Sequence, residues 1–378
     1  MAIRYKPISG LNTTSLKKLI EISGVDLADK PYVDDTVLNS TPTKTSQLTN
    51  DSNYTTDTYV DNEINILKKN TRIFKPNFGC TFYLGQANNL QGSYYTKTLA
   101  QCKEAVGGVI DYIDEVPITF HISYNENTRE FYIVEDRQIM YNMAEWIVNE
   151  KGKTVPAIKM YAQRFDMTHI ESYGVSKFHA KWKEFMREIG TKFKNLGVTY
   201  FAIHNEVTTI VGNTEHLPYL LEEIEYAKSL GYKVAYDYAG GSHYNLTLPE
   251  FKEKLDAHFM NIYPPVTSLG LKATYKEVLS SFANEPYLDI INKVHDEYPN
   301  ADVIINECGV QDNWYALASP ENFNWSNVEK SNGIAPAMYL QALLETTKNM
   351  DVKSVWWWYE LSFDATRKVL NKYIRGEE

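Results

Sequence analysis

The sequence predicts an α/β fold, a (β/α)8 barrel of the TIM type that follows an extended N-terminal arm. From Arg72 onward, short apolar runs alternate with amphipathic helical segments, and eight such pairs can be counted. The apolar runs are continuous rather than strictly alternating, as is typical of parallel strands covered on both faces. Eight strand–helix units in roughly 300 residues fit the size of such a barrel.

The expected elements follow one another without long gaps. Strands are expected at residues 72–85, 116–124, 155–163, 198–206, 232–240, 258–265, 302–309 and 352–360, and "NENTRE" joins the second of them to "FYIVED" in a hairpin. Helices are expected at residues 96–113, 138–150, 177–197, 216–231, 248–257, 287–299, 335–349 and 364–375. The helix at 177–197 has the clearest pattern, because apolar residues recur every three or four positions and Gly197 ends it. A loop with His243 is expected after the fifth strand.

A doubly wound open sheet is the alternative fold. It would require a glycine-rich phosphate loop after its first strand, and "YLGQANNLQG" matches such a loop poorly.

The first 71 residues differ from the rest, so two domains are expected, residues 1–71 and 72–378. "SLKKLIEISGVDL" is consistent with one short helix. The stretch "TPTKTSQLTNDSNYTTDTYV" has seven threonines in twenty residues and no apolar period, so it cannot form a core alone. Residues 1–71 are therefore either a flexible linker or an arm that becomes ordered against a partner.

Composition limits the partners. The formal charge is −10 without a long basic run, so neither nucleic acid nor an anionic membrane is expected to bind. Cys80, Cys102 and Cys308 have neither metal-ligand spacing nor a disulfide framework, and neither a metal nor another cofactor is expected. The start "MAIRYKPISG" lacks an apolar signal region, and no apolar run approaches the ~18 residues of a membrane span. The 28 tyrosines suit either an aromatic core or a sugar-binding surface.

The strongest functional pattern lies at the ends of the strands. The fourth strand ends in Asn205-Glu206 and the seventh in Glu307, while Asp237 lies near the end of the fifth. The carboxyl ends of barrel strands meet at one mouth, where active sites of this fold lie. Two carboxylates there are typical of glycoside hydrolysis, in which one gives a proton to the leaving oxygen and the other attacks the sugar or activates water.

This pattern resembles the clan A retaining glycoside hydrolases, a group that includes many cellulases and mannanases. The resemblance covers the barrel, and it implies that Glu206 is the acid/base and Glu307 the nucleophile. It further implies that Asn205 binds the sugar 2-hydroxyl and Tyr263 holds the nucleophile. Trp358, or Trp356 on the same strand face, would form the sugar platform.

Two departures from that group concern the same site. Many members carry a histidine two residues before the tyrosine, and this chain has Asn261. Many place an arginine near the end of the second strand, where this chain has His121; Arg164, after the third strand, is the candidate substitute. Simpler explanations also stay open: Tyr263 before two prolines can be a rigid strand exit, and the tryptophans can be barrel packing. His204 and Cys308 are expected to be core residues.

The segment "TSQLTNDSNYTT" with "TYVDNEI" resembles N-terminal or connecting segments of bacteriophage tail-fibre and baseplate proteins. That resemblance implies a virion enzyme that cuts a cell-surface polysaccharide and attaches to other tail proteins through residues 1–71. A receptor-binding tail protein that only grips glycan is a second hypothesis, and a bacterial glycosidase with a disordered leader is a third. Several copies can associate, although the sequence has no sustained heptad.

Overall fold

The computed structural model describes residues 72–82, 98–163, 165–266, 272–284, 288–321 and 329–377. The predicted arm, residues 1–71, lies outside the described residues, and so does Arg164. In the described part of the chain, no helix has both the length and the apolar character needed to cross a membrane.

One curled sheet forms the centre of the fold. Its strands run in the order β1 (Asn77–Cys80), β9 (Ser354–Trp357), β8 (Asp302–Cys308), β7 (Ala257–Asn261), β6 (Lys233–Tyr238), β5 (Tyr200–Asn205), β4 (Ala157–Ala162), β2 (Ile118–Asn125) and β3 (Glu130–Ile133). Neighbours pair in parallel except β2 and β3, which form the predicted antiparallel hairpin.

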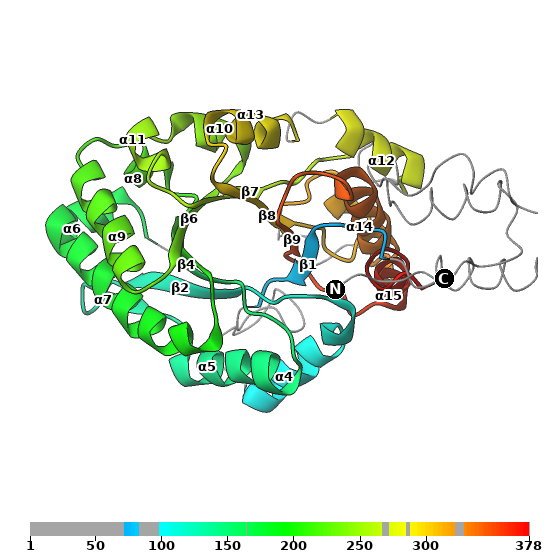
Figure 1. Ribbon diagram of the computed structural model, residues 1–378, viewed down its shortest axis with the longest axis horizontal. Coiled ribbons are helices and arrows are strands. Elements are labelled where there is room, and N and C mark those ends of the chain that lie inside the picture. Colours follow the sequence, from blue (N-terminus) through cyan, green and yellow to red (C-terminus); the bar gives the residue numbers. More distant parts are fainter. Residues whose placement is uncertain are drawn as a thin grey trace, which may run out of the picture. The chain divides into compact units, whose positions relative to one another are not determined.

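The sheet closes on itself. A parallel bridge joins Phe82, just beyond β1, to Ile118 of β2, and the amide of Thr119 donates to the carbonyl of Phe82 at 2.9 Å. At the other edge β1 pairs with β9, so the first and last strands lie side by side (Figure 1). Eight parallel strands thus form a barrel, which confirms the predicted (β/α)8 fold and excludes the open sheet.

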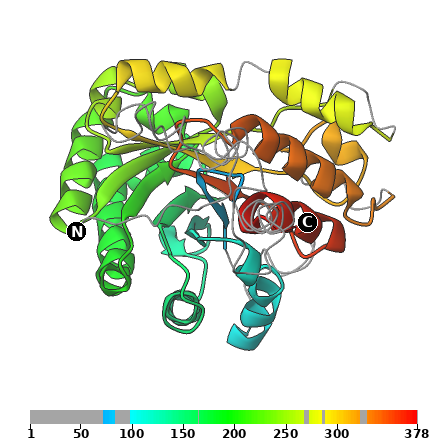
Figure 2. The same cartoon turned by 45° about the vertical axis from the view of Figure 1, so that its right-hand side comes forward.

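Helices surround the barrel, as Figures 1 and 2 show from two directions. They are α4 (Leu99–Gly107), α5 (Arg137–Glu145), α6 (Met167–Tyr173), α7 (Val175–Phe193), α8 (Thr208–Val211), α9 (Leu217–Ser229), α10 (Gly240–Leu246), α11 (Pro249–Lys252), α12 (Tyr275–Asn284), α13 (Asp289–Glu297), α14 (Ile334–Thr347) and α15 (Asp364–Leu370). Shorter 3-10 or π turns cover Ile110–Tyr112, Trp146–Glu150, Lys194–Leu196, Tyr315–Leu317 and Asn371–Arg375. The loop predicted around His243 is wrong, because this residue lies in α10.

Helix α7 illustrates how the sequence positions the outer layer. Its buried face carries Phe178, Trp182 and Ile189, as the apolar period predicts. The indole nitrogen of Trp182 donates to the carbonyl of Ile203 in β5 at 2.6 Å. A 3-10 turn then ends at Gly197 in the left-handed conformation, with φ of 75°. This packing fixes β5, the strand that ends in Asn205.

The barrel interior changes from apolar to polar along the strands. Its deeper layer is a separate apolar cluster of Ala157, Tyr200, Ala202, Ala235, Ala257, Phe259, Ile304 and Trp356. Side chains two positions further along a strand point the same way. In the strands β4, β6, β7 and β8 those positions hold polar residues, namely Lys159, Asp237, Asn261 and Asn306. The mouth-side layer of the interior is therefore a polar network resting on an apolar floor.

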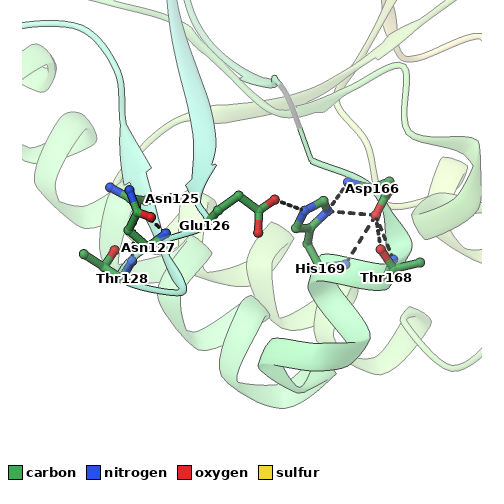
Figure 3. Close-up of polar contacts among 7 residues, drawn as sticks. All are labelled: Asn125, Glu126, Asn127, Thr128, Asp166, Thr168 and His169. Carbon is green, nitrogen blue, oxygen red and sulfur yellow. Dashed lines mark hydrogen bonds and ion pairs between the residues drawn. The ribbon is translucent and has the colours of Figure 1, made fainter.

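The hairpin β2–β3 rises beside this mouth and is fastened to α6. His169 of α6 lies between the carboxylates of Glu126, in the hairpin turn, and Asp166, the N-cap of α6 (Figure 3). Both ring nitrogens lie 2.8 Å from a carboxylate oxygen. The turn itself is closed by Asn125, whose side-chain oxygen accepts from the amides of Asn127 and Thr128.

Candidate active site

Glu307 lies at the mouth-side layer and is almost fully buried. The hydroxyl of Tyr263, which follows β7, donates to its Oε2 at 3.1 Å. The hydroxyl of Tyr161, from β4, contacts its Oε1. Burial raises the pKa of Glu307 well above its usual range, and the nearby carboxylates of Asp237 and Glu206 raise it further. Both oxygens of the candidate nucleophile are thus held by phenols.

Glu206 follows β5 in the left-handed backbone region, with φ of 48°. Such a conformation is unusual for a residue other than glycine and is common at functional positions. Its Oε1 accepts a hydrogen bond of 2.6 Å from the amide of Asn261. The residue is exposed, yet protein crowds its carboxyl enough that loss of hydration raises its pKa. Because Glu206 reaches solvent, we expect a smaller rise than at buried Glu307.

Asn261 connects the two glutamates. It pairs in register with Glu307, and its side-chain oxygen accepts from the amide of Asn306 at 2.8 Å. The carboxylates from the fourth and seventh barrel strands therefore open at the same end of the barrel, as predicted. The position that carries histidine in many clan A enzymes here binds the candidate acid/base directly.

Bulges explain how neighbouring residues enter one network. Asn306 and Glu307 are adjacent in β8, and strict alternation would point them to opposite faces. The register between β8 and β9 shifts between Ile305 and Cys308, and a bulge of this kind re-aims side chains. A similar shift occurs in β5 between Ala202 and Asn205.

Lys159 of β4 is a fully buried cation that the sequence analysis did not select. Its Nζ donates to Asn306 Oδ1 at 3.0 Å, to the Tyr161 oxygen at 3.2 Å and, at 3.4 Å, to Thr81. Burial lowers its pKa, while the carboxylates of Glu307, Asp237 and Glu206 oppose that effect. A lysine inside the apolar run "AIKMYA" is the signal that could have identified it.

Asp237 of β6 is also fully buried. Its Oδ2 lies 2.5 Å from the Tyr161 oxygen and accepts from the Asn306 amide at 2.6 Å. Its Oδ1 has no hydrogen-bond partner among the described residues. Burial raises the pKa of Asp237 to about 7, with Lys159 acting in the opposite direction. From the sequence, this residue is expected either to contact substrate or simply to end a strand.

The other residues predicted for the site do not all lie at the barrel mouth. Asn205 is buried at the mouth beside Asp237 in register, and no hydrogen bond joins its side chain to the rest of the described chain. The ring of Trp358 stacks with 5.6 Å between centroids on Tyr161, one of the two phenols that contact Glu307. Trp356 does not reach the mouth, because it lies fully buried in the apolar floor and donates from its indole to Glu115 at 2.8 Å. We therefore assign Trp356 to packing.

His121 lies next to the network, beside Tyr161. Its Nδ1 is 2.5 Å from Oε1 of Glu135. Its ring packs edge-to-face against Tyr161, with 5.8 Å between the ring centroids. Lys159 lowers the pKa of the candidate nucleophile, and its Nζ lies 3.2 Å from the Tyr161 oxygen that contacts Glu307. His204 and Cys308 are buried core residues, as expected.

Two other features of the described chain lie apart from the glutamates. A cavity of about 520 Å³ opens beyond the ends of β1 and β9, lined by α4 and residues 359–362, and neither glutamate contributes to it. The buried residues His179, His204 and Glu223 have spacing compatible with a metal ion, on the outer side of β5. Each histidine lies 2.8 Å from a Glu223 oxygen, so both oxygens of this carboxylate are already bound within the group.

Comparison with known proteins agrees with this fold. A scan against models of protein families gives no match, and a search of curated proteins finds none either. Among solved structures, the chain is similar to the GH113 beta-mannanase AaManA from Alicyclobacillus acidocaldarius in complex with ManMIm. The two share 14% identity with a TM-score of 0.59, and the match covers 80% of this chain and 99% of that one. It is similar also to PbGH5A, a glycoside hydrolase family 5 enzyme from Prevotella bryantii B14, with 12% identity, a TM-score of 0.53 and coverage of 80% and 99%. At such identities the likeness establishes a glycosidase-like barrel fold.

Proposed function

We propose that this chain is a retaining glycoside hydrolase in which Glu206 is the acid/base and Glu307 the nucleophile. The observation that carries the proposal is the contrast between the two carboxyls. Glu307 is buried and held on both oxygens by Tyr161 and Tyr263, whereas Glu206 is exposed to solvent. A fixed nucleophile and a reachable proton donor at one mouth are what glycoside cleavage requires.

The reaction then follows in two displacements. Protonated Glu206 gives its proton to the glycosidic oxygen while Glu307 attacks the anomeric carbon, so the aglycone leaves as an alcohol and a glycosyl ester forms. Glu206, now a carboxylate, takes a proton from water as the water attacks the anomeric carbon and displaces Glu307. The partnerless amide of Asn205 suits a sugar hydroxyl beside the anomeric carbon, and the Trp358 ring suits a sugar face.

A covalent trap tests the nucleophile. The protein is incubated with 2-deoxy-2-fluoro glycosyl fluorides of several sugars, mannose first because similar structures are mannanases. We expect a mass increase of one fluorosugar on the peptide that contains Glu307, and none in the Glu307→Gln variant. Labelling of another carboxylate, or activity in Glu307→Gln equal to that of the parent, would refute the assignment.

A second candidate function is glycan binding without catalysis. It is favoured by two departures from the clan A pattern, namely Asn261 in place of the histidine and His121 in place of the arginine of the second strand. A polysaccharide panel with a reducing-end assay beside a binding assay separates the two functions. Binding without new reducing ends would support the second.

We propose further that residues 1–71 attach the barrel to a phage tail or baseplate, where it acts on surface polysaccharide of the host. The resemblance of the threonine-rich arm to tail-protein segments supports this role. Deleting residues 1–71 should leave hydrolysis unchanged and abolish incorporation into virions. A truncated protein that still assembles into particles would contradict the attachment role.

A further inference from the structure

The hydroxyl of Tyr161 lies between two carboxyl groups. Its oxygen is 2.5 Å from Oδ2 of Asp237 and also contacts Oε1 of Glu307. A phenol has one proton to donate, so it cannot satisfy two ionised carboxylates at once. Burial holds the pKa of Tyr161 well above its ordinary value, so the phenol keeps its proton. The Tyr161 oxygen also lies 3.2 Å from the Asn306 amide nitrogen. A close contact between two oxygens without a proton is repulsive, so we infer that one of the two carboxyls carries a proton and shares it with the Tyr161 oxygen.

Charge balance gives the same proton count. Lys159 is the buried cation of this layer, with its Nζ 3.2 Å from the Tyr161 oxygen. With both carboxyls ionised the buried cluster would hold an excess negative charge, which is costly away from water. With one proton it is neutral. The other titratable groups facing the cluster are Glu206, Tyr263, Cys80 and His121, the last paired with Glu135.

The distribution of donors decides which carboxyl holds the proton. Glu307 receives a phenol on each oxygen, which suits an ionised carboxylate. The Tyr161 phenol is shared by both carboxyls, and Asp237 receives its one other donor, Asn306, at the same oxygen, Oδ2. Its Oδ1 has no partner among the described residues, whereas both oxygens of Glu307 lie against a phenol. A buried ionised carboxylate with an unsatisfied oxygen is less favourable than a neutral acid in the same place.

We propose that Asp237 is a positioning residue for the reaction, which as a neutral acid donates to the Tyr161 oxygen and so directs the Tyr161 proton to an ionised Glu307. In this arrangement Asp237 Oδ2 accepts from Asn306 and donates to Tyr161, while Lys159 balances the single charge on Glu307. Its catalytic consequence rests on the proposed glycosidase function. Burial raises the pKa of both Asp237 and Glu307, which agrees with one proton retained by the pair at neutral pH, and the donor geometry assigns that proton to Asp237.

The protonated carboxyl can be detected by infrared spectroscopy, without any enzymatic reaction. Infrared spectra of the whole protein are recorded at about pH 6, where ordinary aspartates are ionised, with aspartate or glutamate carboxyl carbons labelled with ¹³C. We expect a carboxylic acid C=O band that shifts on aspartate labelling and is lost in Asp237→Asn. Glu115, whose pKa burial raises, can add a glutamate band but not an aspartate one. Bands that respond only to glutamate labelling would overturn the proposal, whether or not the protein is an enzyme.

The catalytic consequence is tested by the pH dependence of kcat/KM, whose acidic limb reports the ionisation of Glu307. The substrate is a dinitrophenyl glycoside, because its leaving group needs little acid catalysis. Because an amide cannot ionise, Asp237→Asn should keep the acidic limb of kcat/KM within about 0.3 pH units of the parent. If Glu307 held the proton beside an ionised Asp237, removing that negative charge would move the limb down by about one unit or more. Tyr161→Phe should move it up, since Glu307 loses a donor. If the parent hydrolyses no glycoside, the proposed function fails and the infrared result still decides the proton.

Discussion

The side-chain amide of Asn261 donates a hydrogen bond of 2.6 Å to Oε1 of Glu206, while its own oxygen accepts one of 2.8 Å from Asn306. This contact stabilises the ionised form of Glu206 and lowers its pKa, against the larger rise caused by desolvation. In the proposed reaction Glu206 must be protonated to act as the acid. Asn261 therefore helps to set the upper pH limit of activity.

Asn261→Ala should raise the pKa of Glu206 and move the alkaline limb of kcat/KM upward by about half to one pH unit. The profile is measured with a substrate whose leaving group needs protonation. Asn213→Ala is the control, because Asn213 only closes a surface turn by accepting from the amide of Glu215. An unchanged alkaline limb in a folded Asn261→Ala protein would contradict this role of the hydrogen bond.

Glu206→Gln should affect substrates according to their leaving groups. Removing a general acid costs about 10²–10⁴-fold where the leaving oxygen must be protonated. We expect a loss in that range for kcat/KM on phenyl glycosides and a loss of less than about tenfold on dinitrophenyl glycosides. Equal losses on both substrates would show that Glu206 does not supply the proton.

Lys159→Met should move the acidic limb of kcat/KM upward by about one pH unit or more, because Lys159 lowers the pKa of Glu307 and Asp237. Without this cation the two carboxyls bind a second proton at higher pH, and Glu307 is no longer ionised. Lys183→Met is the matched control, since Lys183 pairs with Glu222 at 2.7 Å on the surface. A Lys159→Met profile like that of the control would exclude a role for the buried charge.

The fold and the position of the two glutamates at one barrel mouth could be predicted from the sequence because their signals are local. An apolar run followed by Asn-Glu marks a strand end, and all parallel strands of a barrel end at one mouth. The polar layer beneath was predicted less well. Whether Asn306 joins Glu307 depends on a bulge between β8 and β9, and such a register shift has no local signal.

Depth within the barrel was the other quantity that the sequence did not supply. Trp356 and Trp358 point to the same side of β9, and alternation cannot tell which one lies at the mouth. The pairing of Trp356 with Gly79 puts it level with the apolar floor, so only Trp358 contacts Tyr161. Lys159 differs from these cases, because a charged residue within an apolar strand is visible in the sequence.

His216 lies without solvent exposure at the N-terminus of α9, with its Nδ1 2.8 Å from Nε2 of His179. Burial lowers its pKa to about 4. The folded state therefore binds fewer protons than the unfolded chain between about pH 6.5 and 4, and stability is lost as pH falls through that window.

Relative to His216→Asn, the parent should lose up to about 3 kcal/mol of unfolding free energy between pH 7.5 and 4. This is an upper bound, because local opening at the start of α9 can hydrate the ring at lower cost. Urea denaturation of both proteins at several pH values measures the difference, and shifts at other groups cancel because both proteins share them. A difference that is constant with pH would refute the assignment.

The contact of His169 with Glu126 and Asp166 should hold the β2–β3 hairpin against α6 in a pH-dependent manner (Figure 3). The hydrogen bond from His169 to Glu126 is the largest cause of a raised His169 pKa, and Asp166 adds to it. A histidine with a raised folded-state pKa stabilises fully below about pH 6.5 and loses this contribution as pH rises through its folded value. Because the carboxylates are exposed, the effect should be local and reduced by salt.

Hydrogen exchange of amides 125–128, corrected for intrinsic rates, should therefore become faster between neutral and alkaline pH. Glu126→Gln should give the fast rate at every pH, whereas Glu171→Gln, an exposed change on the same helix, should behave like the parent. Exchange in the turn that does not differ between these variants would mean that Tyr124 and Phe131, which pack on His169 and Tyr173, hold the hairpin without the ion pair.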